Sequence, residues 1–405
     1  MTEDLICLSH LRWDFVYQRP NHLMARAARS KRVFFIEEAR FEPGARPHIQ
    51  RTDREGVGVM TPVVPTGMEA PESNALLADL LDDLIGTEQI DAPILWYYTP
   101  MALPWTRHVA SSVVVYDCMD YLAGFRGASE CLLSLEDELL GRAHLVFSGG
   151  VRLHQRLAAR HQASYCFPSS IDVRHFAAAR LPRPDPADQR SIAMPRLGYA
   201  GVIDERLDLG LIDGVAARRQ DWQIVLLGPL AKIAAAAIPA RRNIHQLGRK
   251  TYGELPSYLA HWNVGWMPFA RNEATAFISP TKTPEYLAAG LPVVSTSIRD
   301  VIEPYGRRGL VRIADSIDET IEAVEESQRA DGTETQRQAD QFLAMGSWDR
   351  TWDAMAILVE QAVTNGSQSE TARSASHLVH VPVPMRLSTA KELQAAPLVV
   401  GAEAL

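Results

Sequence analysis

A lysine and a glutamate three residues apart, in the second half of this sequence, are the side chains that most directly suggest chemistry. Lys282 and Glu285 lie in the stretch 280–295, where Thr283 is a predicted N-cap and Pro284 suits the first helical position. Glu285 then falls in the first turn of a short helix, close to backbone N–H groups that the helix leaves unpaired. An ammonium group, a carboxylate and free N–H groups together suit an anion with a vicinal diol, such as a nucleoside diphosphate and its ribose.

The same stretch also fits a purely structural interpretation. A glutamate in the first helical turn stabilises the helix dipole by roughly 0.3–1 kcal/mol, and Lys282 would then be an ordinary solvated lysine. Gly290 is predicted to end the helix, and residues 292–294 begin an apolar strand. This stretch alone does not decide between the two interpretations.

Glycines at two other predicted strand ends point to the same kind of ligand. Gly201 and Gly228 each end a strand, where the lack of a side chain lets backbone approach a phosphate closely. Neither belongs to a G-x-G-x-x-G fingerprint, which disfavours a nicotinamide enzyme. Arg206 would add a second positive charge if its loop lines the same edge as Lys282; otherwise it is a surface arginine among acidic neighbours, such as Asp204.

Three polar residues mark the corresponding edge of the first half of the chain. His10 and Asp14 follow a predicted strand over 5–9, and Asp120 adjoins one over 113–118. Loops at the carboxyl ends of parallel strands hold the ligands of open α/β folds, so we expect these side chains at the reacting end of a cleft. A capping or loop-fixing role is the alternative for each.

Strand and helix patterns alternate along the chain, which predicts an α/β fold with doubly wound parallel sheets. The proline-rich segment 180–186 is the expected linker. We therefore expect one domain over 1–180 and a second over 190–345, followed by a helix over 347–362. Residues 363–405 are rich in Ser, Thr, Ala and Gln and are expected to form a poorly ordered tail.

Composition narrows the classes of function. A chain of 405 residues exceeds one ordinary core, and its net charge of −8 gives no indication of a nucleic-acid partner. The four cysteines are scattered, which argues against a metal site or a disulfide framework and fits a reducing cytoplasm. We also expect no signal peptide and no membrane span. The basic segment 26–32 is either a solvated face or a peripheral contact with an anionic membrane, at the inner face of the cytoplasmic membrane.

Several stretches carry a resemblance to a known family. The second half is similar to the donor half of GT-B glycosyltransferases, close to family four, and the first half resembles bacterial polysaccharide enzymes of this type. The resemblance covers about residues 5–360 and is carried by 247–248, 255–259, 264–269 and 282–294 in the second half, and by 13–23, 115–120 and 168–172 in the first.

The resemblance implies two Rossmann-like domains facing a cleft, with the helix 347–362 packing back on the first. It implies a retaining, metal-independent transfer of a sugar from a nucleotide-diphosphate donor to a saccharide or lipid-linked acceptor, in surface polysaccharide or glycolipid synthesis. Glu285 would bind the ribose, while Lys282 and Arg206 would neutralise the departing diphosphate; no cofactor beyond the donor co-substrate is implied. The implied donor site comprises Gly201, Arg206, Gly228, Ser279, Thr281, Lys282 and Glu285.

One position departs from the family pattern. Family four commonly has two glutamates separated by seven residues, but Phe277 stands eight residues before Glu285. The role of the missing glutamate near the donor sugar is lost or passes to Asn272, Glu273 or Ser279, so the sugar is not identified. Two other functions stay open: a nucleotide-sugar 2-epimerase, for which no clear set of carboxylates is present, and an inactive nucleotide-sugar-binding scaffold, which Phe277 favours.

Overall fold

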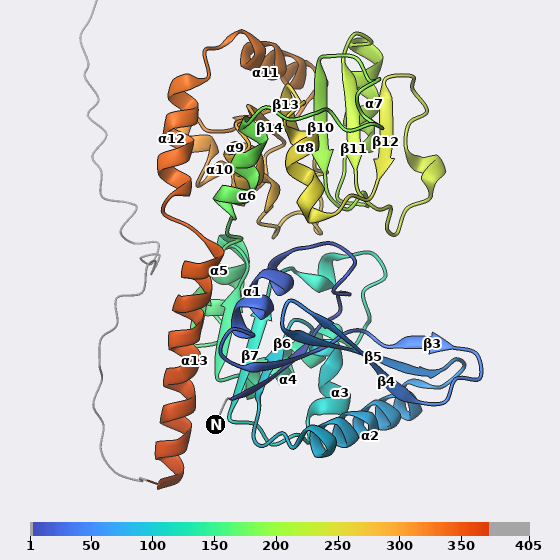
Figure 1. Ribbon diagram of the computed structural model, residues 1–405, viewed down its shortest axis with the longest axis vertical. Helices are drawn as coiled ribbons and strands as arrows, with labels where there is room; N and C mark the ends of the chain where they lie inside the picture. Colours follow the sequence, from blue (N-terminus) through green and yellow to red (C-terminus); the bar gives the residue numbers. More distant parts are fainter. Residues whose placement is uncertain (1–2, 372–405) are drawn as a thin grey trace, which may run out of the picture.

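The computed structural model describes residues 3–371, with the side chains of residues 3–365. Two α/β domains are stacked along the long axis of the molecule, each built on its own sheet (Figure 1). The carboxyl ends of strands in both sheets lead into loops that meet at the boundary between the domains. Of the tail expected over 363–405, residues 372–405 lie outside the described residues, and 363–371 belong to a helix.

The first sheet contains nine strands within the described chain, in the order β3-β5-β2-β1-β6-β7-β8-β9, with β4 paired to β5. Its strands are β1 (Asp4–Leu8), β2 (Arg32–Ile36), β3 (Arg40–Glu42), β4 (His48–Arg54), β5 (Val57–Pro65), β6 (Ile94–Tyr97), β7 (Val113–Cys118), β8 (Leu145–Ser148) and β9 (Ser164–Cys166). Strands β1, β6 and β8 are buried along their whole length, as expected for parallel strands covered on both faces.

Strands β3 and β4 form in a segment whose sequence lacks the pattern of a strand. The segment 40–56 is polar and rich in arginine, so its hydrophobic pattern gives no sign of a strand. Strand β4 is almost wholly exposed and forms because it pairs antiparallel with the buried strand β5. Together they make an arm at the edge of the first sheet (Figure 1).

The helices of the first domain are α1 (Arg19–Ala27), α2 (Ala70–Glu88), α3 (Leu103–Thr106), α4 (Leu132–Arg142) and α5 (Val151–Ala158). The last helix, α13 (Trp348–Thr371), runs alongside the first domain and extends nine residues beyond the predicted end at 362 (Figure 1). Its buried Trp348, Trp352 and Met355 share one hydrophobic cluster with Leu5 and Trp96.

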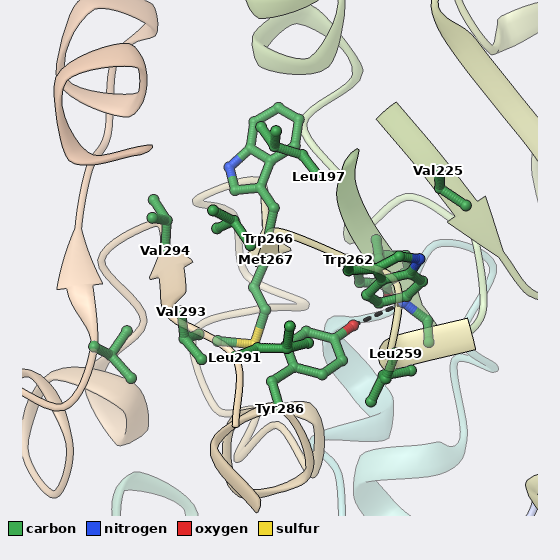
Figure 2. Packing of buried hydrophobic residues seen from close by; sticks show 14 of the residues in the cluster. Leu197, Val225, Leu259, Trp262, Trp266, Met267, Tyr286, Leu291, Val293 and Val294 are labelled. Carbon is green, nitrogen blue, oxygen red and sulfur yellow. Dashed lines mark hydrogen bonds between the residues drawn. The ribbon is translucent and has the colours of Figure 1, made fainter. Parts of the chain in front are cut away.

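The second sheet has six parallel strands in the order β12-β11-β10-β13-β14-β15. These are β10 (Arg196–Ala200), β11 (Gln223–Leu227), β12 (Ile244–Gly248), β13 (Val264–Met267), β14 (Val293–Ser295) and β15 (Arg312–Ile313), with helices α7 (Leu209–Arg218), α8 (Leu255–Leu259), α9 (Lys282–Ala288), α10 (Arg299–Ile302), α11 (Ile317–Arg329) and α12 (Thr333–Leu343). Figure 2 shows the core of this domain, with Trp262 and Tyr286 among its buried side chains. The ring of Trp262 lies against Gly198, and that of Tyr286 lies against Gly265.

The chain passes from the first domain to the second earlier than the sequence indicated. Helix α6 (Val173–Ala177) follows β9 and already packs on the second domain, because Phe176 belongs to the core of that domain. The proline-rich segment 180–186 also lies on the second domain, where Asp185 pairs with Arg196 at 2.7 Å. Its prolines prevent helix and strand, as expected, but the chain changes domain between β9 and α6.

The N-terminus of α9 also differs by two residues from the expectation. The helix begins at Lys282 with Thr281 as its N-cap, so Thr283 is not the cap. The side chain of Thr283 is buried, and its hydroxyl donates a hydrogen bond of 3.6 Å to the sulfur of Met267 in the core. Glu285 nevertheless falls in the first turn, as predicted, and Gly290 ends the helix with a positive φ of 86°.

Candidate functional site: opposite charges at the domain boundary

Two glycine turns and one ammonium group form the centre of the site in the second domain. A Cβ atom on Gly201 would lie only 2.6 Å from Nζ of Lys282, so the lysine side chain can lie across this turn only because residue 201 is glycine. A Cβ atom on Gly228 would overlap the carbonyl group of Gly201. The turns after β10 and β11 are therefore pressed together, with a positive charge directly above them.

Tyr286 fixes the helix that carries this lysine to the strand that carries the turn. Its hydroxyl accepts a hydrogen bond of 2.7 Å from the backbone N–H of Ala200, which immediately precedes Gly201 (Figure 2). The tyrosine is fully buried. Because Tyr286 is the neighbour of Glu285 in α9, this single bond sets the position of Lys282 and Glu285 relative to the glycine turn.

Arg206 contributes the second cation and is itself held in place. Asp204 accepts hydrogen bonds from Nε of Arg206 at 3.0 Å and from its Nη2 at 2.7 Å. Asp204 is buried and the arginine is about one-quarter exposed. This pairing leaves Nη1 of Arg206 as the part of the guanidinium that can face a phosphate oxygen.

Asp120 brings a carboxylate from the first domain to these cations. Burial raises the pKa of Asp120, and the charges of Arg206 and Lys282 oppose that rise. Burial lowers the pKa of Lys282, an effect that Glu285 opposes and Arg206 reinforces. Burial likewise raises the pKa of Glu285, against the charge of Lys282. The structure thus places Lys282 within electrostatic reach of Glu285, Arg206 and, across the domain boundary, Asp120.

His10 borders the same cluster as a neutral group. Burial lowers its pKa to about 4, with the backbone of Tyr98 opposing and Lys232 adding to the shift. Its Nδ1 is buried and makes no hydrogen bond to the described residues. Nζ of Lys232 lies 5.0 Å from the centre of the Phe125 ring, and the guanidinium of Arg206 lies 5.6 Å from the same ring. A neutral imidazole with an unused nitrogen can accept or donate a proton.

Asp14 is placed differently. Its carboxylate is two-thirds exposed and pairs with Arg54 of β4 at 3.1 Å. The link of Asp14 to the second domain is its backbone carbonyl, which accepts a hydrogen bond from Arg249. In this structure Asp14 contacts the second domain through its backbone, while its side chain belongs to the first.

The segment before α9 reaches toward the first domain. The carbonyl of Ser279 accepts a hydrogen bond from Ser169 at 3.1 Å, and the side chain of Thr281 opposes the rise in the pKa of Glu285 that burial causes. Phe277 lies 4.8 Å from the ring of Tyr121, and the guanidinium of Arg152 covers it at 5.0 Å. Position 277 therefore supplies an aromatic contact between the domains where a donor-binding glutamate was expected.

Sequence reasoning missed three members of the site. Lys232 follows Gly228 in the loop after β11. Like Arg206, it is a cation soon after a glycine at a strand end, and that signal was present in the sequence. Tyr286 adjoins Glu285, but its bond to Ala200 depends on the packing of α9 against the sheet. Phe125 lies in a loop with no local signal of function.

Other features of the described chain lie apart from this charged cluster. A surface cavity of about 1210 Å³ runs between α11, α12 and the edge strands of the second sheet, and one of about 540 Å³ lies beside α6, α12 and the start of α13. Within residues 3–371, no cluster of three or more His, Cys, Asp or Glu side chains is arranged to hold a metal ion. None of the helices described here combines the length and apolarity needed to cross a membrane.

The basic segment 26–32 is charge-paired. Arg26 and Arg29 both bind Asp349 of α13, Lys31 binds Glu3 and Arg32 binds Asp4. Each cation of this segment therefore has an acidic partner, and the segment presents less net positive charge than the sequence suggested.

Part of this chain is similar in sequence to known glycosyltransferases. Residues 197–328 match the family model described as Glycosyl transferases group 1. A Bacillus subtilis (strain 168) protein, TuaH, named provisionally as a teichuronic acid biosynthesis glycosyltransferase, is 28% identical over 244 residues. That alignment covers 55% of this chain and spans only 60% of the length of TuaH.

Three solved structures show the same two-domain fold. They are a sucrose-phosphate synthase from Thermosynechococcus elongatus (14% identity, 90% of this chain and 100% of that one, TM-score 0.68), Anabaena HepE in complex with UDP and glucose (15%, 88% and 99%, 0.63), and a UDP-forming trehalose-phosphate synthase from Burkholderia xenovorans in complex with glucose-6-phosphate (12%, 88% and 99%, 0.65). The GT-B fold expected from the sequence is confirmed by these structures, and the second domain is similar to the group 1 glycosyltransferases.

Proposed function

We propose that this protein transfers a sugar from a nucleoside diphosphate donor, UDP being the first candidate, to a saccharide or lipid-linked acceptor in surface polysaccharide or glycolipid synthesis. The observation that carries the proposal is the ammonium group of Lys282 lying over Gly201, beside Arg206. Two comparisons support it: the family match, over residues 197–328, lies in the domain that carries Lys282, and HepE has the same fold and was solved in complex with UDP and glucose. The name of TuaH supports the polysaccharide setting.

The arrangement suits departure of a diphosphate. The bond between the donor sugar and the β-phosphate breaks, and negative charge grows on the leaving phosphate oxygens. Lys282 and Nη1 of Arg206 neutralise that charge from fixed positions, and the backbone of Gly201 and Gly228 allows the phosphates to approach closely. Glu285 accepts hydrogen bonds from the two ribose hydroxyls.

Transfer with retention needs the acceptor oxygen to form its bond on the face that the diphosphate leaves. The acceptor proton then passes to the departing phosphate oxygen, so no separate base is needed. His10 and Asp120 lie on the first-domain side of this point and orient the acceptor hydroxyl or a donor-sugar hydroxyl. Asp14 lies farther out, where the first-domain loop meets Arg249. Because Phe277 offers no hydrogen bond, we place carboxylate contact with the donor sugar on Asp120.

Calorimetric titration with UDP, GDP and dTDP tests the donor site directly. We expect one of them to bind, and Lys282→Ala and Glu285→Ala each to weaken binding about tenfold or more, because each removes a charged hydrogen bond. Lys31→Ala is the control, since Lys31 pairs with Glu3 at the far side of the first domain. If no nucleotide binds, or if the control weakens binding as much as Lys282→Ala, the proposed donor site is wrong.

Product analysis then separates transfer from the alternatives. A 2-epimerase would convert the nucleotide sugar in the absence of any acceptor, whereas a transferase needs an acceptor to release nucleoside diphosphate beyond slow hydrolysis. An inactive scaffold would bind the nucleotide and do neither.

A further inference from the structure

A carboxylate of the second domain sits on the N-terminus of a helix in the first. Asp300, in α10, accepts a hydrogen bond of 2.7 Å from the backbone N–H of Val151 and a longer one of 3.4 Å from that of Arg152. These N–H groups begin helix α5 and have no partner within the helix. Asp300 is only 5% exposed, and each of its carboxylate oxygens accepts one of these hydrogen bonds across the domain boundary.

Gly150 leaves room for this contact. A Cβ atom at this position would come within 3.0 Å of Cβ of Ser279 and closer still to Oδ2 of Asp300. The φ of Gly150 is −165°, an extended conformation that any residue adopts. Position 150 therefore needs a glycine because the second domain leaves no space for a side chain. The backbone conformation at this position does not require one.

The surrounding contacts belong to the same patch. Phe277 packs on Arg152 and Tyr121, and the carbonyl of Ser279 accepts a hydrogen bond from the hydroxyl of Ser169. The segment that leads into the donor helix α9 and the carboxylate of Asp300 thus dock together on the start of α5. Burial of a carboxylate is unfavourable unless its hydrogen bonds are kept, so this patch favours one relative position of the domains.

Two further contacts cross the boundary. The carboxylate of Glu205, whose side chain is 8% exposed, accepts a hydrogen bond of 2.8 Å from the N–H of Arg126, and exposed Arg249 donates to the carbonyl of Asp14. Asp300 and Glu205 are therefore buried acids of the second domain that bond to the first, and Asp300 is the one that binds the start of a helix.

We propose that Asp300 is a positioning residue that locks the second domain onto α5, in the orientation in which Asp120 of the first domain faces Arg206 and Lys282. Its catalytic consequence rests on the proposed transferase function, but its conformational consequence does not. Removing the carboxylate, or inserting a methyl group at Gly150, frees the domains to open.

The distance between the domains tests the proposal without any turnover. Spin labels are attached through Asp83→Cys in α2 and Glu322→Cys in α11, two exposed positions, after replacement of the exposed Cys131 by serine. Pulsed electron–electron double resonance then measures the distance between the two labels in the parent, in Asp300→Ala and in Gly150→Ala. Glu303→Ala is the matched control, because it removes an acid three residues away whose partner, Arg307, is in the same domain.

We expect a longer and broader distance distribution in both Asp300→Ala and Gly150→Ala, and the parent distribution in Glu303→Ala. Thermal unfolding identifies a variant that fails to fold, and Gly150→Ala then carries the test from the opposite side of the contact. Parent-like distributions in both folded variants would overturn the proposal.

A second readout links the contact to transfer. Both variants are expected to bind UDP within about threefold of the parent, since the donor site lies in one domain, and to lose about tenfold in kcat. Parent-like kcat in an opened variant would refute the positioning role. If the parent binds no nucleotide, the proposed function fails while the distance measurement still decides the role of Asp300 in closure.

Discussion

The hydroxyl of Tyr286 offers a test of how the donor helix is held. Tyr286→Phe removes one oxygen atom from a fully buried side chain and leaves the ring in its contact with Gly265. The N–H of Ala200, which now donates to this hydroxyl at 2.7 Å, is left without a partner in the core. The substitution therefore isolates the bond that joins α9 to the turn at Gly201.

The expected size of the effect follows from the burial of both partners. Leaving a buried donor unsatisfied costs about 1–3 kcal/mol. For a domain of this size, each kcal/mol lowers Tm by about 2–4 °C. Because the same bond sets the position of Lys282 over Gly201, we also expect affinity for UDP to fall by about three- to tenfold.

Differential scanning calorimetry and UDP titration measure both effects. Tyr258→Phe is the matched control: it is the same change in the same domain, but Asp188, the partner of that hydroxyl, is 42% exposed and can bind water instead. If Tyr286→Phe changed stability and UDP binding no more than Tyr258→Phe does, the bond to Ala200 would not hold the donor helix in place.

Three further outcomes are expected. Gly198→Ala forces a Cβ atom into the ring of Trp262 and should destabilise the protein by about 1–3 kcal/mol in urea unfolding, whereas Gly86→Ala, with open space around it, should not. Arg19→Met leaves the buried carboxylate of Asp117 without its cation, and a loss of about 3–5 kcal/mol in the same assay is expected; a loss under about 1 kcal/mol would contradict this. Burial lowers the pKa of Lys282, so its charge is lost and UDP affinity falls as pH rises through that lowered value; Lys282→Arg should remove this dependence in titrations between about pH 7 and 10.

The parts of the site that depend on local signals were predictable from the sequence. Gly201 and Gly228 follow short apolar runs, and the glutamate in the first turn of α9 follows a threonine and precedes a C-terminal glycine. These patterns specify strand ends and helix ends without knowledge of the rest of the chain. The N-cap shifted from Thr283 to Thr281 because the packing of Thr283 beneath Met267 is a tertiary contact.

The rest of the site arises from contacts between residues far apart in the chain. Phe277 reads as a missing glutamate, yet its partners Tyr121 and Arg152 lie in the other domain, more than 100 residues away. The pairing of Asp300 with the start of α5 spans a similar separation and leaves no local pattern. The crossing before α6 was misplaced because proline marks an irregular segment and does not show which domain that segment contacts.

Helix α13 has a consequence for the order in which the chain acquires its structure. Trp348, Trp352 and Met355 complete the hydrophobic cluster that also contains Leu5 and Trp96, more than 250 residues earlier. During synthesis the ribosome releases all nine strands of the first sheet, and then the whole second domain, before this helix emerges. The nascent first domain therefore waits with an uncovered apolar face, the condition in which chaperone binding and aggregation compete with folding.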